Sequence, residues 1–279
     1  MPTTAEKRAT FRKLHDAGCF VLPNPWDIGS ARYLQGLGFK ALASTSAGFA
    51  FTLGLPDGAV SRDVMLAHFR DIVTATDVPV NADFENGYAD EPEGVAESVR
   101  LCIDTGVAGL SIEDSTSDPT IPLYDFDLAL ARVRAARAAI DKAGGGVVFT
   151  ARSEGFVRGR PDLDETIRRL KAFAAAGADC LYAPGIKTPE QIAAVVKAVA
   201  PKPVNFLMAT ATDLTLGDLT GLGLRRVSLG GTLARVAWTA VTRAARDITD
   251  TGSFKSLAGT MANAELNAFF AKDMKQRKA

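Results

Sequence analysis

Residues 78–114 read VPVNADFENGYADEPEGVAESVRLCIDTGVAGLSIED. The stretch holds a short apolar run, Val78–Ala82, then a polar and acidic segment, an amphipathic segment and a second apolar run, Gly109–Ile112. Gly106 stands just before the second run, where a helix commonly ends in a left-handed residue. The pattern predicts a strand, a helix and a further strand, with acidic residues where the first strand ends.

The same unit recurs along the chain. The predicted strands are Cys19–Pro23, Ala41–Thr45, Val78–Ala82, Gly109–Ile112, Val147–Ala151, Cys180–Ala183, Val204–Met208 and Arg226–Leu229. Strands that alternate with helices indicate an α/β protein with a parallel sheet, and the number eight favours closure into a (β/α)8 barrel of the TIM type. An open doubly wound sheet is the alternative architecture.

The 279 residues fit one barrel domain, residues 1–279, because such barrels commonly run to about 250 residues. A helical segment, Thr232–Asp250, follows the last predicted strand. The tail beyond it, residues 251–279, carries an apolar stripe of Leu266, Phe269 and Phe270. We expect this tail to be helical and to pack on the barrel or on a neighbouring subunit.

The charge balance excludes two classes of partner. Lys plus Arg and Asp plus Glu number 32 each, so there is no excess positive field to hold a nucleic acid or an anionic membrane. The polar N-terminus, Met1–Arg12, lacks the apolar stretch of a secretory signal. We therefore expect a cytoplasmic protein.

Polar residues follow several predicted strands, at the barrel end where this fold carries its chemistry. Asp83 and Glu85 follow the third strand, Glu113 the fourth, and Arg152 the fifth. Because these strands are neighbours, we expect the side chains to converge on one side of the barrel mouth.

Asp83, Glu85 and Glu113 could together hold Mg²⁺ or Mn²⁺, since hard cations prefer oxygen ligands. Mg²⁺ usually keeps several waters and binds one or two carboxylates directly, so the ligand set leaves room for some of the three acids to act through water. If the strand continues, alternation places Asp83 and Glu85 on the same side, and a cation relieves their repulsion. The alternative is a structural ion network with Arg152, although three acids against one arginine leave negative charge uncompensated.

Other kinds of site find little support. The two histidines, His15 and His68, fall on predicted helices away from the strand ends, which disfavours zinc or iron held by imidazole. Cys19, Cys102 and Cys180 lie in or beside apolar segments, as reduced core cysteines do. There is no nucleophile elbow, P-loop or Gly-rich dinucleotide loop.

The order and spacing of several motifs resemble the isocitrate lyase/phosphoenolpyruvate mutase superfamily over roughly Phe11 to Val236. They are LPNPWDIGSAR at 22–32, STSAG at 44–48, LGLPDG at 53–58, Asp83-x-Glu85-x-Gly87-Tyr88, Ile112-Glu113-Asp114 and Ala151-Arg152. The resemblance implies a barrel whose last helix is exchanged between neighbours, usually in a dimer of dimers. It also implies Mg²⁺ or Mn²⁺ and a small 2-oxo or 2-hydroxy acid as substrate.

The resemblance also implies roles for individual residues. Thr45, Ser46 and Ala47 match the segment whose backbone N–H groups hold substrate oxygens. Asp57 matches the acid at the edge of the metal site, and Arg152 the arginine that grips the substrate carboxylate. The metal-binding carboxylates of the family match Asp83, Glu85 and Glu113.

Two departures from the family pattern limit the expected activity. Isocitrate and methylisocitrate lyases carry a Lys-x-Cys-Gly-His signature on the loop after strand four, whereas Ser115–Tyr124 reads STSDPTIPLY here. Without that cysteine, we expect neither of these two activities. Glu85 also replaces the second aspartate of the Asp-x-Asp pair of the family, one methylene longer.

These residues predict a Mg²⁺-dependent lyase that breaks a C–C bond beside a carboxylate through a metal-stabilised enolate. Arg152 orients the carboxylate, and Glu113 serves both the metal and the reaction. Asp57 or a metal-bound water carries the proton, with Tyr88 and Tyr124 as weaker candidates. The loop 115–124 closes over the site.

Three alternatives remain open. The first is a phosphonopyruvate-type mutase or hydrolase, which would use the same site for P–C chemistry. The second is a Schiff-base aldolase that uses Lys187, although turn residues flank this lysine. The third is a catalytically silent binding or assembly subunit.

Overall fold

The strands form one parallel barrel, as predicted from the sequence. The computed structural model describes residues 2–278. Its strands are β1 (Phe20–Leu22), β2 (Leu42–Ala43), β3 (Val80–Asp83), β4 (Gly109–Glu113), β5 (Val148–Arg152), β6 (Cys180–Tyr182), β7 (Val204–Leu207) and β8 (Arg226–Ser228). They pair in the order β1-β8-β7-β6-β5-β4-β3-β2. The N–H of Ala43 donates to the carbonyl of Pro23 at 3.0 Å, which joins the two ends of the sheet. The (β/α)8 fold is confirmed, and the open sheet is excluded.

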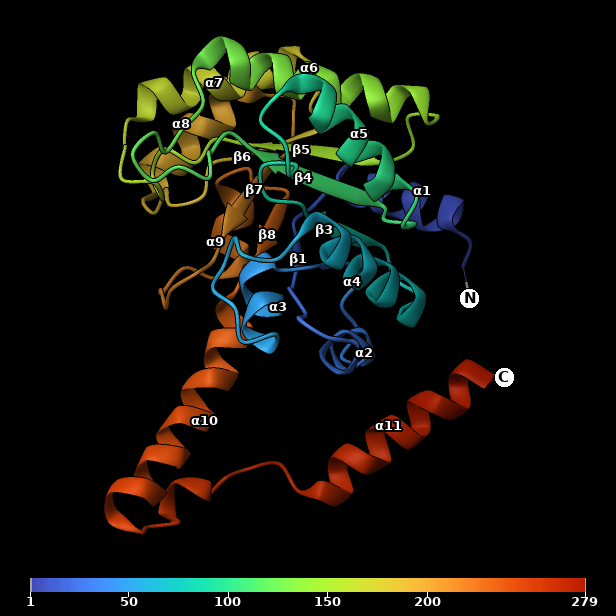
Figure 1. Cartoon of the computed structure of the whole chain (residues 1–279), viewed down its shortest axis with the longest axis vertical. Helices are drawn as coiled ribbons and strands as arrows, with labels where there is room; N and C mark the ends of the chain where they lie inside the picture. Colours follow the sequence, from blue (N-terminus) through green and yellow to red (C-terminus); the bar gives the residue numbers. More distant parts are fainter. Residues whose placement is uncertain (1, 279) are drawn as a thin grey trace.

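Helices surround the barrel and follow its strands (Figure 1). They are α1 (Thr4–Leu14), α2 (Ile28–Gly36), α3 (Ser46–Thr52), α4 (Arg62–Ala75), α5 (Pro92–Ile103), α6 (Phe126–Lys142), α7 (Leu163–Ala175), α8 (Pro189–Val199), α9 (Leu216–Gly221), α10 (Thr232–Thr251), the 3-10 helix η1 (Lys255–Leu257) and α11 (Asn263–Lys278). Helix α7 begins after Asp162, whose side chain accepts the N–H of Glu165 at 2.9 Å. No helix within residues 2–278 combines the length and apolar character needed to cross a membrane.

The amino-terminal end of the barrel is closed by α1. Phe11 of this helix is fully buried among Leu22, Ala43 and Val148. Gly109 makes room for it, because a Cβ at that position would lie 2.5 Å from the Phe11 ring. With one end plugged by an aromatic side chain, the carboxyl ends of the strands form the open end of the barrel.

The C-terminal segment leaves the barrel (Figure 1). Helix α10 projects outward and exposes Val236 (61%) and Val241 (59%). Helix α11 lies against α2 of the same chain, where Phe269 packs on Gly36 and Nε of Arg32 donates to Asp273 at 2.9 Å. Helix α11 thus contacts α2, whereas the apolar face of α10 is uncovered within the part of the chain that is described.

Candidate active site

Two connected cavities open at the carboxyl ends of the strands. The outer cavity, of about 510 Å³, is lined by Ser46, Asp57, Gly58, Glu85, Asn86, Glu113, Ser115, Thr116, Ser117, Arg152, Glu154, Val157, Arg158, Pro184 and Leu207. The inner cavity, of about 210 Å³, extends into the barrel and is lined by residues that include Thr45, Ala47, Asn81, Asp83, Asn205 and Arg226. Ser46, Asp57, Arg152 and Leu207 line both. The predicted site residues therefore border one continuous site.

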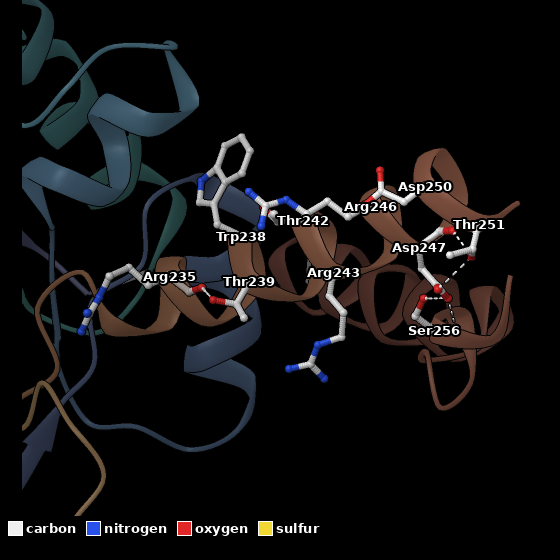
Figure 2. Close-up of a pocket in the computed structure, with 10 residues that line it drawn as sticks. All are labelled: Arg235, Trp238, Thr239, Thr242, Arg243, Arg246, Asp247, Asp250, Thr251 and Ser256. Carbon is white, nitrogen blue, oxygen red and sulfur yellow. Dashed lines mark hydrogen bonds between the residues drawn. The ribbon is translucent and has the colours of Figure 1, made fainter. Parts of the chain in front are cut away.

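A further hollow, of about 850 Å³, runs along α10 (Figure 2). Its wall consists of α10 side chains, such as Arg235, Trp238 and Arg246, together with Ser256. Figure 2 shows the side chains of Arg243 and Trp238 pointing to different sides of the helix. A single exposed helix does not converge several groups on one ligand, so we place the candidate site at the strand ends.

Arg152 lies between three carboxylates. As the last residue of β5, it contacts Asp83 at the end of β3 through Nη1 at 2.7 Å and Glu113 at the end of β4 through Nη2 at 3.0 Å. Its Nε donates to Glu154 at 2.8 Å. Burial alone would lower the pKa of Arg152, but these three carboxylates raise it well above its ordinary value. The negative charge around this guanidinium thus exceeds its own positive charge.

Glu113 interacts with a second arginine and with the loop after β4. Nη2 of Arg158 donates to Glu113 at 3.2 Å and to the hydroxyl of Ser115 at 3.0 Å, and that hydroxyl donates to Glu113. Burial raises the pKa of Glu113, but Arg152, Ser115 and Arg158 outweigh it and hold the pKa below its ordinary value. Glu113 is therefore a buried carboxylate that stays ionised.

Glu154 is a site residue that the sequence analysis did not single out. It is buried, and burial raises the pKa of its carboxyl although Arg152 opposes the shift. The signal was present, because residues two apart on an extended strand point to the same side. Glu154 follows Arg152 by two positions, just beyond the end of β5, and Nε of Arg152 donates to it.

Glu85 reaches the outer cavity by a strained turn. Strand β3 ends at Asp83, and both Glu85 (φ 45°) and Tyr88 (φ 56°) have left-handed backbone conformations, which are uncommon outside glycine. The strand does not continue through Glu85, so the alternation that would place Asp83 and Glu85 on one side does not apply. The Tyr88 hydroxyl donates to Glu85 at 2.8 Å. Burial raises the pKa of Glu85 to about 7, and the charge of Asp83 adds to the shift.

The positions of Asp83, Glu85 and Glu113 suit a cation that keeps part of its water shell better than one with protein ligands alone. Within residues 2–278, no three His, Cys, Asp or Glu side chains are grouped so as to hold a metal ion among themselves. Asp83 and Glu113 meet at Arg152, whereas Glu85 contacts Tyr88. Mg²⁺ needs only one or two direct carboxylates and keeps its waters. The oxygen donors and the negative charge along the two cavities are suited to such an ion.

The remaining predicted substrate-binding residues border the inner cavity. Thr45 caps α3, and its side chain accepts the N–H of Gly48 at 3.2 Å. The N–H of Ser46 donates to Asp83 at 3.0 Å. Asp57 lies on the loop before α4, and burial followed by the charge of Asp83 raises the pKa of this carboxyl. Asp83 therefore links the backbone of this segment to Arg152.

Two weaker candidates lie outside the reacting region. The Tyr124 hydroxyl donates to Asp90 at 2.5 Å and accepts from Asn86 at 3.1 Å, which ties the loop after β4 to the loop after β3. Tyr124 thus has a structural role. Lys187 is exposed and lines neither cavity, so the position supports no imine chemistry at this site.

Known proteins share this architecture. A family model described as phosphoenolpyruvate phosphomutase matches residues 11–249. A Burkholderia cenocepacia protein, whose structure is designated a lyase/mutase, is 46% identical and superimposes with a TM-score of 0.92 over 96% of each chain. An uncharacterised protein of Mycobacterium tuberculosis is 34% identical over 86% of this chain and 89% of its own.

Named relatives cover most of the chain as well. An oxaloacetate decarboxylase of Paraburkholderia xenovorans is 33% identical over 81% of this chain and 75% of its own. A probable 2-methylisocitrate lyase of Corynebacterium glutamicum is 30% identical over 83% of this chain and 76% of its own. Proteins with this fold and this level of identity thus carry more than one activity name.

Proposed function

The chain belongs to the phosphoenolpyruvate phosphomutase family, within the isocitrate lyase/phosphoenolpyruvate mutase superfamily, and we propose that it is a Mg²⁺-dependent C–C lyase. Its substrate would be a small 2-oxo or 2-hydroxy carboxylic acid, cleaved beside the carboxylate through an enolate. The observation that carries the proposal is Arg152, placed at the strand ends among carboxylates on one cavity. Family members named as decarboxylases and lyases of small acids support the reaction class.

The cation would be held by Glu85 and Glu113, with Asp83 acting directly or through water. All three border the connected cavities. When bound, Mg²⁺ or Mn²⁺ supplies positive charge beside the substrate oxygens and lowers the cost of the negative charge that develops there. Burial is the main cause of the raised pKa of Glu85, and the charges of Asp83, Glu113 and Asp57 raise that pKa further, so a cation beside Glu85 would favour its ionised form.

Arg152 binds and orients the substrate carboxylate in this proposal. Its Nε, Nη1 and Nη2 all contact protein carboxylates. A substrate carboxylate therefore takes the place of one of these partners rather than meeting a free guanidinium. The bidentate fork of arginine then fixes the plane of the substrate acid, which lysine cannot do.

Asp57 is the proposed proton carrier. It lines both cavities, and its pKa is raised by burial and by Asp83. A carboxyl whose pKa moves toward neutrality holds a proton more readily and can deliver it to a carbanionic carbon. The loop 115–124 adds Ser115, Thr116 and Ser117 to the outer cavity, and its closure would exclude water.

We also propose that the enzyme is neither isocitrate nor methylisocitrate lyase. The loop 115–124 contains no cysteine to protonate the enolate carbon. A relative of 30% identity carries the name 2-methylisocitrate lyase, so this exclusion needs its own assay. Formation of pyruvate and succinate from 2-methylisocitrate at a rate above that of simpler acids would contradict it.

Phosphorus–carbon chemistry is the second candidate. The family model is that of a phosphomutase, and Thr116 and Ser117 place hydroxyl groups on the outer cavity, where they could contact a phosphoryl group. Phosphorus NMR with phosphonopyruvate distinguishes the two candidates, because conversion of the phosphonate signal indicates P–C chemistry.

The exposed apolar face of α10 supports the proposal that this helix is exchanged between neighbours in a dimer of dimers. Trp238, Val241 and Ile248 are exposed on it, at a spacing that places them on one side of the helix. Light scattering on the purified chain should give a tetramer mass, and a monomer at micromolar concentration would contradict this assembly. A cytoplasmic location is part of the same proposal.

The decisive experiment is turnover of oxaloacetate, malate and their alkyl derivatives by metal-depleted and reconstituted protein. We expect activity to vanish with a chelator and to return with Mg²⁺ or Mn²⁺. Arg152→Lys, which keeps the charge but loses the fork, serves as the matched variant and should retain metal binding with reduced turnover. Full turnover after exhaustive metal removal would refute the proposal.

A further inference from the structure

Arg226 carries a positive charge inside the barrel without an acidic partner. It is the first residue of β8, is 2% exposed and lines the inner cavity. Its Nε donates to Asn205 at 2.8 Å and its Nη2 to Thr150 at 3.0 Å. Its Nη1 lies 3.3 Å from Nε2 of His15. Among residues 2–278, no carboxylate is within ion-pairing distance of this guanidinium.

The histidine contact brings no negative charge. A guanidinium has no acceptor, so Arg226 must donate to Nε2 of His15. Nδ1 of His15 is then the protonated nitrogen and donates to the carbonyl of Phe11 at 2.8 Å. Burial, together with the charge of Arg226, lowers the pKa of His15 to about 3. His15 is therefore neutral, and so are Asn205 and Thr150.

The surroundings of Arg226 are polar where a barrel of this type normally holds branched apolar side chains. Asn81, Ser111, Asn205 and Ser228 share the inner cavity with it. Asn81 is 3% exposed, and its side-chain oxygen has no hydrogen-bond partner. A buried charge without a counter-ion and a buried acceptor without a donor both carry large desolvation costs. The guanidinium without a counter-ion calls for an anion on this cavity, whereas the unpaired Asn81 oxygen, which can only accept, calls for a donor such as water beside it.

The two arginines that line the inner cavity differ in charge balance. Arg152 already has three carboxylate partners, so an anion that approaches it must compete with them. Arg226 has none, and two of the five N–H groups of a guanidinium remain after the three contacts above. An anion that enters the inner cavity therefore gains more from Arg226 than from Arg152.

We propose that the inner cavity is an anion-binding site in which Arg226 holds a small carboxylate or halide ion. A volume of about 210 Å³ admits such an anion. The anion is either a second carboxylate of the substrate or a free inorganic ion. The site itself follows from the geometry of Arg226, and only its assignment to a substrate carboxylate rests on the proposed lyase function.

The first test needs no turnover. Thermal unfolding is followed while chloride replaces a bulky sulfonate, which carries no carboxylate, at constant ionic strength, in the wild type, in Arg226→Met and in the control Arg225→Gln. Arg225 is the neighbouring residue, makes a long contact to the carbonyl of Gly18 and lines neither cavity. We expect chloride to raise the Tm saturably in the wild type and the control but not in Arg226→Met. Equal responses in all three proteins, or none in the wild type, would overturn the proposal.

A crystallographic experiment on the wild type tests the site even if Arg226→Met does not fold. Wild-type crystals soaked in bromide should give an anomalous peak beside the Arg226 guanidinium. A peak confined to the protein surface would contradict the site, whatever the behaviour of the variant.

The source of the anion is resolved with oxaloacetate, a diacid, and pyruvate, a monoacid, as probes. If a substrate carboxylate occupies the site, oxaloacetate competes with chloride, and Arg226→Met weakens oxaloacetate binding by about tenfold or more while pyruvate binding changes little. If a free ion occupies it, the stabilisation by oxaloacetate and by chloride is additive, and the variant loses only the chloride effect. Chloride binding without lyase activity would contradict the proposed function but would still support the anion site.

Discussion

Replacing Arg152 by methionine should destabilise the protein strongly at pH 8 and weakly at acidic pH. Arg152 is the shared partner of Asp83, Glu113 and Glu154, and its removal leaves three carboxylates facing one another. Breaking a buried ion pair typically costs about 3–5 kcal/mol. In the variant, Glu113 still forms an ion pair with the half-exposed Arg158, and Asp83 still accepts the N–H of Ser46. We therefore expect the free energy of unfolding to fall by an amount near the lower limit, about 3 kcal/mol.

The pH dependence follows from the sign of the carboxyl shifts. Without the guanidinium, the folded-state pKa of Glu113 rises from below its ordinary value, and the pKa of Glu154, which burial already raises, moves higher still. Each such group costs stability at high pH, and the cost disappears as the pH falls through the raised pKa, by about 1.4 kcal/mol per pH unit for each carboxyl. The difference between wild type and variant should therefore shrink from pH 8 to pH 5.

Urea unfolding at both pH values measures this difference, with Arg168→Met as the control. Arg168 is half exposed and bonded to Glu165 on the surface of α7, so its loss should cost less than about 1 kcal/mol at either pH. A variant at position 152 that is as stable as the wild type at pH 8, or one whose deficit is the same at pH 5, would refute the ion network around Arg152.

Three further predictions concern single side chains. His68 is buried and stacks on Phe49 with the ring centroids 3.7 Å apart, and burial lowers the pKa of His68 to about 4. Its contribution to stability is therefore complete above pH 6.5 and is lost as the pH falls toward 4, by about 1.4 kcal/mol per pH unit. Urea titrations across this range should show a shallower acid loss in His68→Leu, and an unchanged slope would contradict the shift. Gly109→Ala should lower the free energy of unfolding by about 1–3 kcal/mol, because the new Cβ would lie 2.5 Å from the Phe11 ring. The control is Gly29→Ala on α2, where the nearest atom to the new Cβ is 3.5 Å away, so this variant should be as stable as the wild type or more stable. Tyr88→Phe removes the hydrogen bond that lowers the pKa of Glu85, so NMR titration should place that pKa above about 7, and a lower value would contradict the contact.

The sequence predicted the barrel and the edge that carries its polar residues, because both depend on local patterns. Each predicted strand is present, and the residues that follow β3, β4 and β5 meet at one end. The sequence pattern did not predict the path of the chain beyond Asp83. A glutamate with φ of 45° is uncommon, so the extended pattern suggested alternation where the structure has a turn. Glu85 therefore approaches the outer cavity separately from Asp83.

Arg226 was missed for a different reason. It opens a predicted strand, a place where arginine normally reaches solvent, and nothing in its neighbours indicates which face of the strand points inward. Asn205 reaches Arg226 only because β7 pairs with β8, and His15 reaches Arg226 only because of the position of α1. Burial of this charge is a property of the assembled barrel rather than of any local pattern.

The opposite charge balance of Arg152 and Arg226 bears on how an acid would bind. At Arg152, a substrate carboxylate replaces a protein carboxylate, so the number of ion pairs is unchanged and the net gain is small. At Arg226, an incoming anion forms the first ion pair of that guanidinium, at a buried position where the gain exceeds that in bulk water. If both arginines act on one diacid, affinity comes mainly from the deep arginine, and Arg152 mainly sets the orientation. Loss of Arg226 should then raise KM with little effect on kcat, whereas Arg152→Lys should reduce kcat.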